Sequence, residues 1–463
     1  MSFILADAWL VTMNERREVL ERASVAVADD RIVDIGARST LVHRHPEAEV
    51  IDCSGHIVIP GMVNTHTHLF QTLLKGLGDD MVLKKWFTCM TGPSAAVLTV
   101  EDAHVAALHG CVESIRSGVT TLVDFMYVHP VPGLTRAVVD AFKATGMRGF
   151  VGRGFMTTGA ELGVPPNLIE DPVVALGDAT ALIRETNGEG GRVKVGLAPC
   201  MIWTVDERTL RLTREAADEA GVLVTMHVAE TNFEIDHAQR TYGQTDAEFL
   251  SDIGFLGADV LAVHCVQCSS HDIRVLRHHD VKVSHNPCSN LYLASGCPPI
   301  PAMSAQGITV GLASDGPASS NNHNLFQAMK FAALMQKGFS RDATVITAEK
   351  VLEMATIDGA RAVGLEAEIG SIEIGKRADL AVIDYANPFM TPIHDPVSAI
   401  VYSALGHETR TVVIDGQIVM RDCIVTSVDE AAVRGRAQAC ADALAVRAGV
   451  DHFKCRPWRS STI

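Results

Sequence analysis

Histidines and one aspartate end apolar runs at four separate places in the chain. His66 and His68 close the run MVNTHTH, and residues two apart in a strand point to the same side. His227 lies at the end of VLVTMHV, His264 near the end of VLAVHC, and Asp315 directly after ITVGLAS. A neutral imidazole is a good ligand for zinc or iron, and a buried aspartate without a compensating cation would be costly. One His-x-His is a weak signal, but the four places together predict a site for one divalent metal ion.

Glu230 follows His227 by three residues and is a candidate for moving protons. A carboxylate in the loop beyond a strand could hold a proton next to water that a cation activates. The alternative is a purely structural role, in which Glu230 caps a helix beside His227 in the core. His264 is the fourth histidine of the set.

Substrate contacts are expected from the segments that follow the ligands. Gln71 and Trp86 lie after the first run and could contact a flat heterocycle, by hydrogen bonds and by stacking respectively. A packing role for Trp86 is equally supported. Ser319 or Asn321, beyond Asp315, could touch a leaving group.

The segment SHNPCSN contributes two further candidates, His285 and Asn290. Both lie beyond one apolar run and could face the same pocket. For His285 a structural role is as well supported as a direct one.

Two other metal patterns carry less weight. Cys265 and Cys268 form a lone C-x-x-C, and no second such pair completes a four-sulfur site. Lys194 could bridge two metals if it were modified, but it lies early in its run. We therefore expect a single ion, zinc before iron, and core positions for the two cysteines.

The elements that must position these residues alternate between apolar runs and helical patterns such as 206–221 and 269–280. Near-continuous apolar strands separated by helices are typical of a parallel sheet, and eight such units close into a (β/α)8 barrel. Catalytic groups of this barrel gather at the carboxyl ends of its strands. A doubly wound sheet is the alternative, although no glycine-rich dinucleotide loop supports it. The eight runs are 62–68, 119–125, 148–155, 193–199, 222–228, 260–265, 281–287 and 308–315.

Short strands with Asp and Gly turns occupy both ends of the chain. The two ends therefore predict one small β-sandwich domain interrupted by the barrel. The expected division is 1–60 for its first part, 61–368 for the metal-dependent barrel, and 369–463 for its second part with a terminal helix.

Composition excludes several classes of protein. The 463 residues include 39 Lys+Arg and 55 Asp+Glu, for a net charge of −16. This acidic balance argues against nucleic acid and anionic membrane surfaces. Eleven irregularly spaced cysteines are not a secreted disulfide framework. With no signal peptide and no apolar stretch of about 18 residues, we expect a soluble, cytoplasmic protein.

The motifs PGMVNTHTH, HVAE, HC, HNPCSN and SDG, in this order, resemble the amidohydrolase superfamily. They are most similar to its aminohydrolase branch of S-adenosylhomocysteine, cytosine and guanine deaminases and s-triazine hydrolases. The resemblance extends over essentially the whole chain. EMATIDGAR, EIGSIEIGKRADL and VVIDGQIVM look especially like the triazine chlorohydrolase and melamine deaminase subgroup.

The resemblance implies His66, His68, His227 and Asp315 as metal ligands, Asp315 also as the base, and Glu230 as the proton shuttle. It implies that His264 contacts the attacking water, with a fifth ligand as an alternative. Related enzymes are commonly dimers or larger, so a homo-oligomer is expected.

The implied reaction is the hydrolytic deamination of an amino-substituted nitrogen heterocycle, such as a pterin, a purine base or an s-triazine. Loss of a halide or an alkylamine from a triazine-like ring is an alternative, because the same attack releases either group. A non-catalytic scaffold of the same fold is a distant alternative, since every ligand is present, and a redox or zinc–sulfur module built on Cys265 and Cys268 is a distant third. Adenosine-type members carry a His-x-x-Tyr-like signature after the fourth strand, where this chain reads APCMIWTV, which disfavours a nucleoside.

Overall fold

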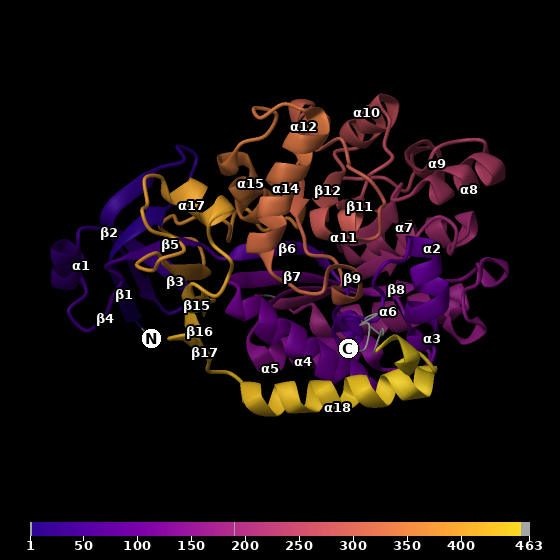
Figure 1. Cartoon of the computed structure of the whole chain (residues 1–463), viewed down its shortest axis with the longest axis horizontal. Coiled ribbons are helices and arrows are strands. Elements are labelled where there is room, and N and C mark those ends of the chain that lie inside the picture. The colour runs from indigo at the N-terminus through magenta and orange to yellow at the C-terminus, as the bar shows by residue number, and fades with distance from the viewer. Residues whose placement is uncertain (1, 189, 455–463) are drawn as a thin grey trace, which may run out of the picture.

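Two β-sheets organise the computed structural model, which describes residues 2–188 and 190–454. One is an eight-stranded parallel sheet with helices around it. The other is a nine-stranded mixed sheet. Figure 1 shows the mixed sheet at one side of the molecule, with the parallel sheet and its helices filling the rest.

The parallel strands pair in strict chain order from β6 to β13. A doubly wound sheet would reverse its order part-way, so that alternative is excluded. The predicted eight-stranded TIM-like sheet is confirmed. Its strands are β6 (Met62–Thr67), β7 (Val119–Met126), β8 (Arg148–Phe155), β9 (Val193–Pro199), β10 (Val224–Val228), β11 (Val260–His264), β12 (Lys282–His285) and β13 (Val310–Leu312).

The first and last strands, β6 and β13, meet at a polar seam. The amide of Asp315 donates to the carbonyl of His66 at 3.1 Å. Asn64 Nδ2 donates to Ser314 Oγ at 2.8 Å, and the Ser314 amide donates to Asn64 Oδ1 at 3.1 Å. This seam ties the segment that carries Asp315 to the strand that carries the two histidines.

Helices surround the parallel sheet and begin at caps that the sequence supplies. In α4, Thr99 Oγ1 accepts from the Asp102 amide at 3.1 Å while Asp102 Oδ2 accepts from the Thr99 amide at 2.9 Å. The helical patterns over 206–221 and 269–280 are confirmed as α7 and α10. The helical elements are η1 (Leu69–Leu74), α2 (Leu83–Trp86), η2 (Phe87–Thr91), α3 (Gly92–Ala95), α4 (Val100–Arg116), α5 (Leu134–Thr145), η3 (Ala160–Leu162), η4 (Pro166–Leu168), α6 (Pro172–Thr186), α7 (Glu207–Ala220), α8 (Asn232–Tyr242), α9 (Asp246–Asp252), α10 (Ser270–His278), α11 (Pro287–Tyr292), α12 (Ile300–Ala305), α13 (Pro317–Ser320), α14 (Leu325–Ser340), α15 (Ala348–Ala355) and α16 (Ile357–Ala362).

The mixed sheet combines strands from both ends of the chain, in the order β17-β16-β15-β14-β5-β1-β2-β3, with β4 beside β1. The junction is the antiparallel pair of β5 and β14, in which Pro60 faces Leu380 and His56 faces Asp384. The union of the two ends is therefore confirmed. The elements are β1 (Ser2–Val11), β2 (Val19–Ala28), β3 (Arg31–Gly36), α1 (Arg38–Arg44), β4 (Glu49–Asp52), β5 (His56–Pro60), β14 (Leu380–Asp384), α17 (Pro396–Tyr402), β15 (Thr409–Ile414), β16 (Gln417–Arg421) and β17 (Ile424–Val425).

The last long helix, α18 (Glu430–Ala448), runs along α4 on the outside of the barrel, and η5 (Asp451–Phe453) follows it (Figure 1). Arg447 forms an ion pair with Asp102 there. None of the helices in the described part of the chain is both long and apolar enough to cross a bilayer. The ten cysteines among the described residues are all free, as the composition predicts.

Candidate metal centre

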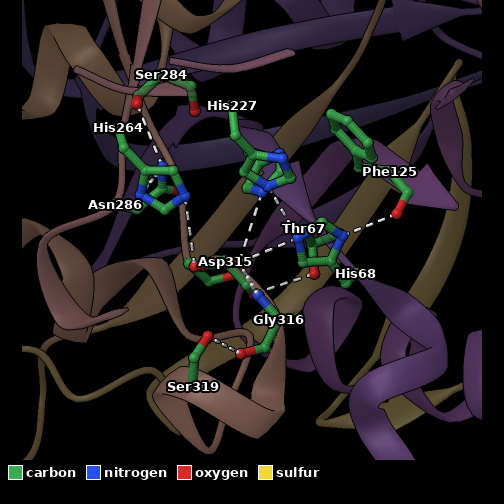
Figure 2. Close-up of polar contacts among 12 residues, drawn as sticks. Thr67, His68, Phe125, His227, His264, Ser284, Asn286, Asp315, Gly316 and Ser319 are labelled. Carbon is green, nitrogen blue, oxygen red and sulfur yellow. Dashed lines mark hydrogen bonds and ion pairs between the residues drawn. The ribbon is translucent and has the colours of Figure 1, made fainter. Parts of the chain in front are cut away.

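Four strand ends bring five buried side chains to one point at the carboxyl end of the parallel sheet. They belong to β6, β10 and β11 and to the residues that follow β6 and β13. Figure 2 shows His68, His227, His264 and Asp315 turned toward a common centre. The five side chains are those of His66, His68, His227, His264 and Asp315.

The distances within this cluster fit a shared cation. The Nε2 atoms of His66 and His68 each lie 3.5 Å from Asp315 Oδ1. Within each of two overlapping triplets, the ligand atoms lie no more than 4.8 Å apart; the triplets are His66–His68–His227 and His66–His264–Asp315. Ligand atoms at about 2.0–2.2 Å from one zinc ion are themselves about 3–4 Å apart.

Main-chain carbonyls orient two of the histidines. His68 Nδ1 donates to the Phe125 carbonyl, and His227 Nδ1 donates to the Cys200 carbonyl, each at 2.8 Å (Figure 2 shows the first bond). The Nε2 atoms of both neutral rings are then lone-pair acceptors, as a metal requires. These two atoms lie only 3.3 Å apart, with no proton to place between them. A cation is the natural partner for two such facing lone pairs.

His66 gives a second, independent indication. Its ring is completely buried, and neither ring nitrogen has a hydrogen-bond partner among the described residues. Buried polar groups without a partner are rare in native proteins and call for an explanation. A metal ion bound at Nε2 supplies one, so three imidazole nitrogens and one carboxylate fit a divalent cation.

Burial holds these groups in the protonation states that bind metal. It lowers the pKa of His66 to about 4 and that of His68 to about 3, because a charged imidazolium would lose its hydration. The pKa of His227 is lowered well below its ordinary value for the same reason. Burial alone would raise the pKa of Asp315, but the neighbouring histidines, His66 foremost, hold it well below its ordinary range.

Glu230 lies beside the cluster with a different environment. Its Oε1 accepts from Ser295 Oγ at 2.9 Å, and its Oε2 lies 3.6 Å from His264 Nε2. Burial and the charge of Asp315 raise the pKa of Glu230, against the opposing effect of His264. One carboxyl of the site therefore favours the protonated state and the other the ionised state, which is the arrangement that acid–base work needs.

Four non-glycine residues near the carboxyl ends of the barrel strands have positive backbone φ angles. Ala229, His264, Cys265 and Asp315 have φ values of +50°, +73°, +51° and +61°. Non-glycine residues seldom adopt this left-handed region, and such residues concentrate at active sites. Hydrogen bonds hold the amides of three of these residues: Ala229 donates to Asp246 Oδ2, Cys265 to the Val228 carbonyl and Asp315 to the His66 carbonyl.

A cavity of 280 Å³ adjoins the cluster. His68, His227, His264, Glu230 and Asp315 all line it, so the cluster is open to a ligand. The rest of its wall is mostly apolar and aromatic: Trp86, Phe87, Tyr127, Met156, Met201, Trp203, Phe233 and Leu293 are among its residues.

The model of the amidohydrolase family matches residues 57–419, a span that contains all eight barrel strands and every residue of the cluster. The chain belongs to the amidohydrolase family. As a member of this family, the protein is a hydrolase that acts on carbon–nitrogen bonds and carries a His/Asp metal site.

Curated amidohydrolase relatives match nearly the whole chain. The 5'-deoxyadenosine deaminase of Methanosarcina mazei is 37% identical over 96% of this chain and 98% of its own length. The 5-methylthioadenosine/S-adenosylhomocysteine deaminase of Acetivibrio thermocellus is 36% identical over 94% and 97%.

Solved structures give the same fold. A zinc-bound adenosine deaminase from Xanthomonas campestris has a TM-score of 0.90 at 28% identity, covering 96% of this chain and 98% of that one. A variant of atrazine chlorohydrolase from Arthrobacter aurescens has a TM-score of 0.90 at 22% identity, covering 95% and 100%, and shares the fold.

Three of the predicted substrate contacts line the cavity of this amidohydrolase: Gln71, Trp86 and Ser319. Gln71 Nε2 lies 3.4 Å from the Tyr127 hydroxyl, and its Oε1 has no partner among the described residues. Trp86 Nε1 donates to the Ala318 carbonyl at 2.9 Å, so its ring is fixed while it faces the cavity.

Other candidates lie outside the cavity wall. Asn290 Oδ1 lies 2.9 Å from His264 Nδ1, behind that ring. His285 is buried, with both ring nitrogens lacking a partner among the described residues. Asn321 Oδ1 accepts from the Gly76 amide at 2.8 Å. None of the three is among the residues that line the cavity.

The less favoured metal patterns do not join the cluster. Lys194 lies near the amino end of β9, and its Nζ donates to the Gly188 carbonyl. Cys265 and Cys268 are buried, and neither belongs to a metal-capable group found among the described residues.

Lys84, Trp203 and Phe233 are among the cavity residues that the sequence did not predict. Lys84 Nζ lies 4.6 Å from the centre of the Trp203 ring and 4.8 Å from that of Phe233. Trp203 belongs to APCMIWTV, directly after β9, so the rule of strand ends could have found it. The meeting of all three depends on loop paths that no local pattern reports.

Proposed function

We propose that the protein is a zinc-dependent hydrolytic deaminase of a purine-type substrate. The observation that carries the proposal is the pair of facing Nε2 atoms of His68 and His227, 3.3 Å apart, in one cavity with Asp315 and Glu230. The relatives that match 94–96% of the chain at 36–37% identity are named as deaminases of adenine nucleosides, which supports a purine-type substrate.

In this proposal His66, His68, His227 and Asp315 hold the cation. A divalent cation there lowers the pKa of water toward neutrality and so makes it an attacking group. Asp315, whose pKa is low, arrives ionised, accepts one proton of the attacking water and passes it to the amino group, which leaves the ring carbon as ammonia when the carbon–nitrogen bond breaks. The other proton of the water returns to Glu230 at the end of the reaction.

Glu230 delivers a proton to the ring nitrogen beside the carbon that carries the amine. Its raised pKa favours arrival in the protonated state. His264 Nε2 faces both carboxylates, at 3.6 Å from Glu230 Oε2 and 3.9 Å from Asp315 Oδ2. His264 Nδ1 already donates to Asn290 Oδ1 at 2.9 Å. In our proposal the ring is therefore an imidazolium, and its second proton, on Nε2, lies between the two carboxyl groups and steadies the developing oxyanion. His264 then acts as a donor rather than as a fifth ligand.

The names of the relatives favour a nucleoside, against the expectation drawn from the missing His-x-x-Tyr-like signature, and the cavity wall favours a particular kind of nucleoside. The segment APCMIWTV, which lacks the His-x-x-Tyr-like signature, supplies Met201 and Trp203 to the wall. With Met156 and Phe233 these side chains offer an apolar surface, which suits an apolar group better than a hydroxyl. We therefore place 5'-deoxyadenosine and 5-methylthioadenosine ahead of adenosine. The homo-oligomer and the cytoplasmic location stay predictions.

The test combines metal analysis with a substrate panel. We expect about one zinc per chain and ammonia release from the deoxy and thio nucleosides at a higher kcat/KM than from adenosine. The panel also contains adenine, guanine, a pterin, melamine and atrazine. Release of ammonia from the pterin or melamine alone would contradict the purine. Chloride or alkylamine release from the triazine alone would contradict deamination, and a metal-free, inert protein would favour the scaffold.

A further inference from the structure

A buried histidine outside the cavity, His323, joins the metal centre through two hydroxyl groups. It lies in the loop between α13 and α14 and is completely buried. Its Nδ1 lies 3.2 Å from Thr67 Oγ1, and its Nε2 lies 3.2 Å from Thr72 Oγ1. Thr67 stands between the two proposed ligands His66 and His68 in the chain.

The hydrogens available to Thr67 decide which group donates in its contact with His323. Thr67 Oγ1 donates its single hydrogen to the Asp315 carbonyl at 3.1 Å. It can therefore only accept from His323, which places the proton of the neutral ring on Nδ1. Nε2 is then an acceptor for the hydroxyl of Thr72. In the resulting chain of hydrogen bonds Thr72 donates to His323, and His323 donates to Thr67. Thr67 then donates to the main-chain carbonyl of Asp315.

The end of this chain is a strained residue. Asp315 has a φ of +61°, which a residue with a side chain seldom adopts without support. Its carbonyl accepts from Thr67 and, at 3.0 Å, from Ser314 Oγ, while its amide donates to His66. A fixed carbonyl fixes the direction in which the Asp315 carboxylate leaves the backbone.

The surroundings of His323 are built to hold the ring. Its amide donates to Glu113 Oε1 at 3.3 Å, and Lys75 Nζ holds the other oxygen of Glu113 at 2.5 Å. Gly110 of α4 leaves room for the ring, because a Cβ there would lie 3.0 Å from His323 Nε2. Burial, together with the charges of Lys75 and His109 and against that of Glu113, lowers the pKa of His323 to about 4. The ring is neutral at neutral pH.

We infer that His323 is a positioning residue that orients the Thr67 hydroxyl and thereby sets the Asp315 carboxylate toward the cation. The inference rests on the proposed function, since it concerns the same metal centre. If it is correct, metal binding depends on the hydrogen bond that His323 Nδ1 donates. If His323 only filled space, metal binding would depend on the volume of the side chain.

Two amide substitutions separate the ring nitrogens. In His323→Asn the amide nitrogen can take the place of Nδ1, and in His323→Gln the amide can take the place of Nε2. His323→Leu fills the space without either. Partners that orient metal ligands are worth about 10–100-fold in metal affinity. We expect the Leu and Gln variants to bind zinc about tenfold more weakly than the wild type in competition with a chromophoric chelator, and the Asn variant to stay within about threefold.

The cobalt-substituted proteins supply a spectroscopic readout. The visible absorption bands of the Leu and Gln variants should shift, while those of the Asn variant should match the wild type. Equal weakening in all three variants, or no change in any, would overturn the inference. A wild-type protein that binds no zinc or cobalt would instead overturn the proposed function, and this inference with it.

Two threonine variants keep the test decisive if His323→Leu fails to fold. Thr67→Val should weaken zinc binding about as much as His323→Leu, whereas Thr72→Val, one step farther along the chain, should cost less. In the double variant Thr67→Val/His323→Leu the losses should not add, because both break one chain of hydrogen bonds. Fully additive losses, or equal effects of the two threonines, would contradict the proposed direction.

Discussion

The two ends of the barrel bury charged groups in opposite ways. At the amino end, Arg148 starts β8 and is buried, with Nε 2.7 Å from Asp379 Oδ2 and Nη2 2.7 Å from Asp415 Oδ1. At the carboxyl end, no histidine nitrogen lies closer than 3.5 Å to a carboxylate oxygen of Asp315. The charge of Arg148 is compensated by carboxylates of the chain itself, whereas the distances between the histidines and Asp315 leave space for an ion.

The charged groups at the amino end therefore stabilise the fold, whereas those at the carboxyl end are arranged to bind a ligand. Asp379 lies just before β14 and Asp415 in the turn between β15 and β16, so their bonds to Arg148 tie the mixed sheet to the barrel. Removing one partner of such a buried pair leaves an uncompensated charge. Removing a group of the metal centre leaves a cluster that was already short of partners, and the loss should fall on binding and rate.

The largest expected effect is on the rate, at the carboxyl end. Glu230→Gln should lower kcat about 10²–10⁴-fold, the usual contribution of a group that moves a proton. Metal content should stay near that of the wild type, because Glu230 is not a ligand in our proposal. Thermal unfolding should occur at the same or a higher temperature, since the substitution removes a buried carboxyl beside Asp315. Kinetics, metal analysis and calorimetry on one preparation check all three.

Asp315→Asn is the matched control for Glu230→Gln, because it changes a carboxylate to an amide in the same cavity. This variant should lose both zinc and activity. If Glu230→Gln lost as much zinc as Asp315→Asn, Glu230 would be a ligand and its assigned role would be wrong.

The next effect is on stability, at the amino end. Arg148→Met should lower the free energy of unfolding by about 3–5 kcal/mol, the usual cost of breaking a buried ion pair on one side. Zinc content and kcat of the folded fraction should remain unchanged, because the substitution lies at the far end of the strands. Denaturant unfolding and kinetics at a permissive temperature measure the two quantities.

An exposed ion pair provides the control for Arg148. Arg136 pairs with Glu185 on the surface, with both side chains about half exposed (50% and 55%). Arg136→Met should cost no more than about 1 kcal/mol. Equal costs for the two arginines would show that burial does not set the value of the Arg148 pair.

The residues at the two ends of the barrel also differ in how far the sequence predicts their contacts. The gathering of the four histidines and Asp315 was predictable because these residues end apolar runs, and the carboxyl ends of parallel strands converge. The pairing of Arg148 with Asp379 was not predictable, since it joins β8 to a residue 231 positions away, just before β14 of the other sheet. His323 stands in the polar run SSNNHN, where nothing local marks a buried ring. Periodicity reports which face of an element is buried, whereas contacts between loops depend on the path of the whole chain.

The smallest effect is expected from the thiols beside the metal centre. Cys268 lies four residues beyond His264 and is buried, yet it does not belong to the cluster that could hold a cation. A buried thiol of this kind acts as a small apolar side chain, so Cys268→Ala should lower the free energy of unfolding by only about 1 kcal/mol. Zinc content and kcat should match the wild type, while His68→Ala in the same assays should lose zinc. Loss of zinc from Cys268→Ala would show that the carboxyl end of the barrel uses sulfur as well as nitrogen and oxygen to hold its ion.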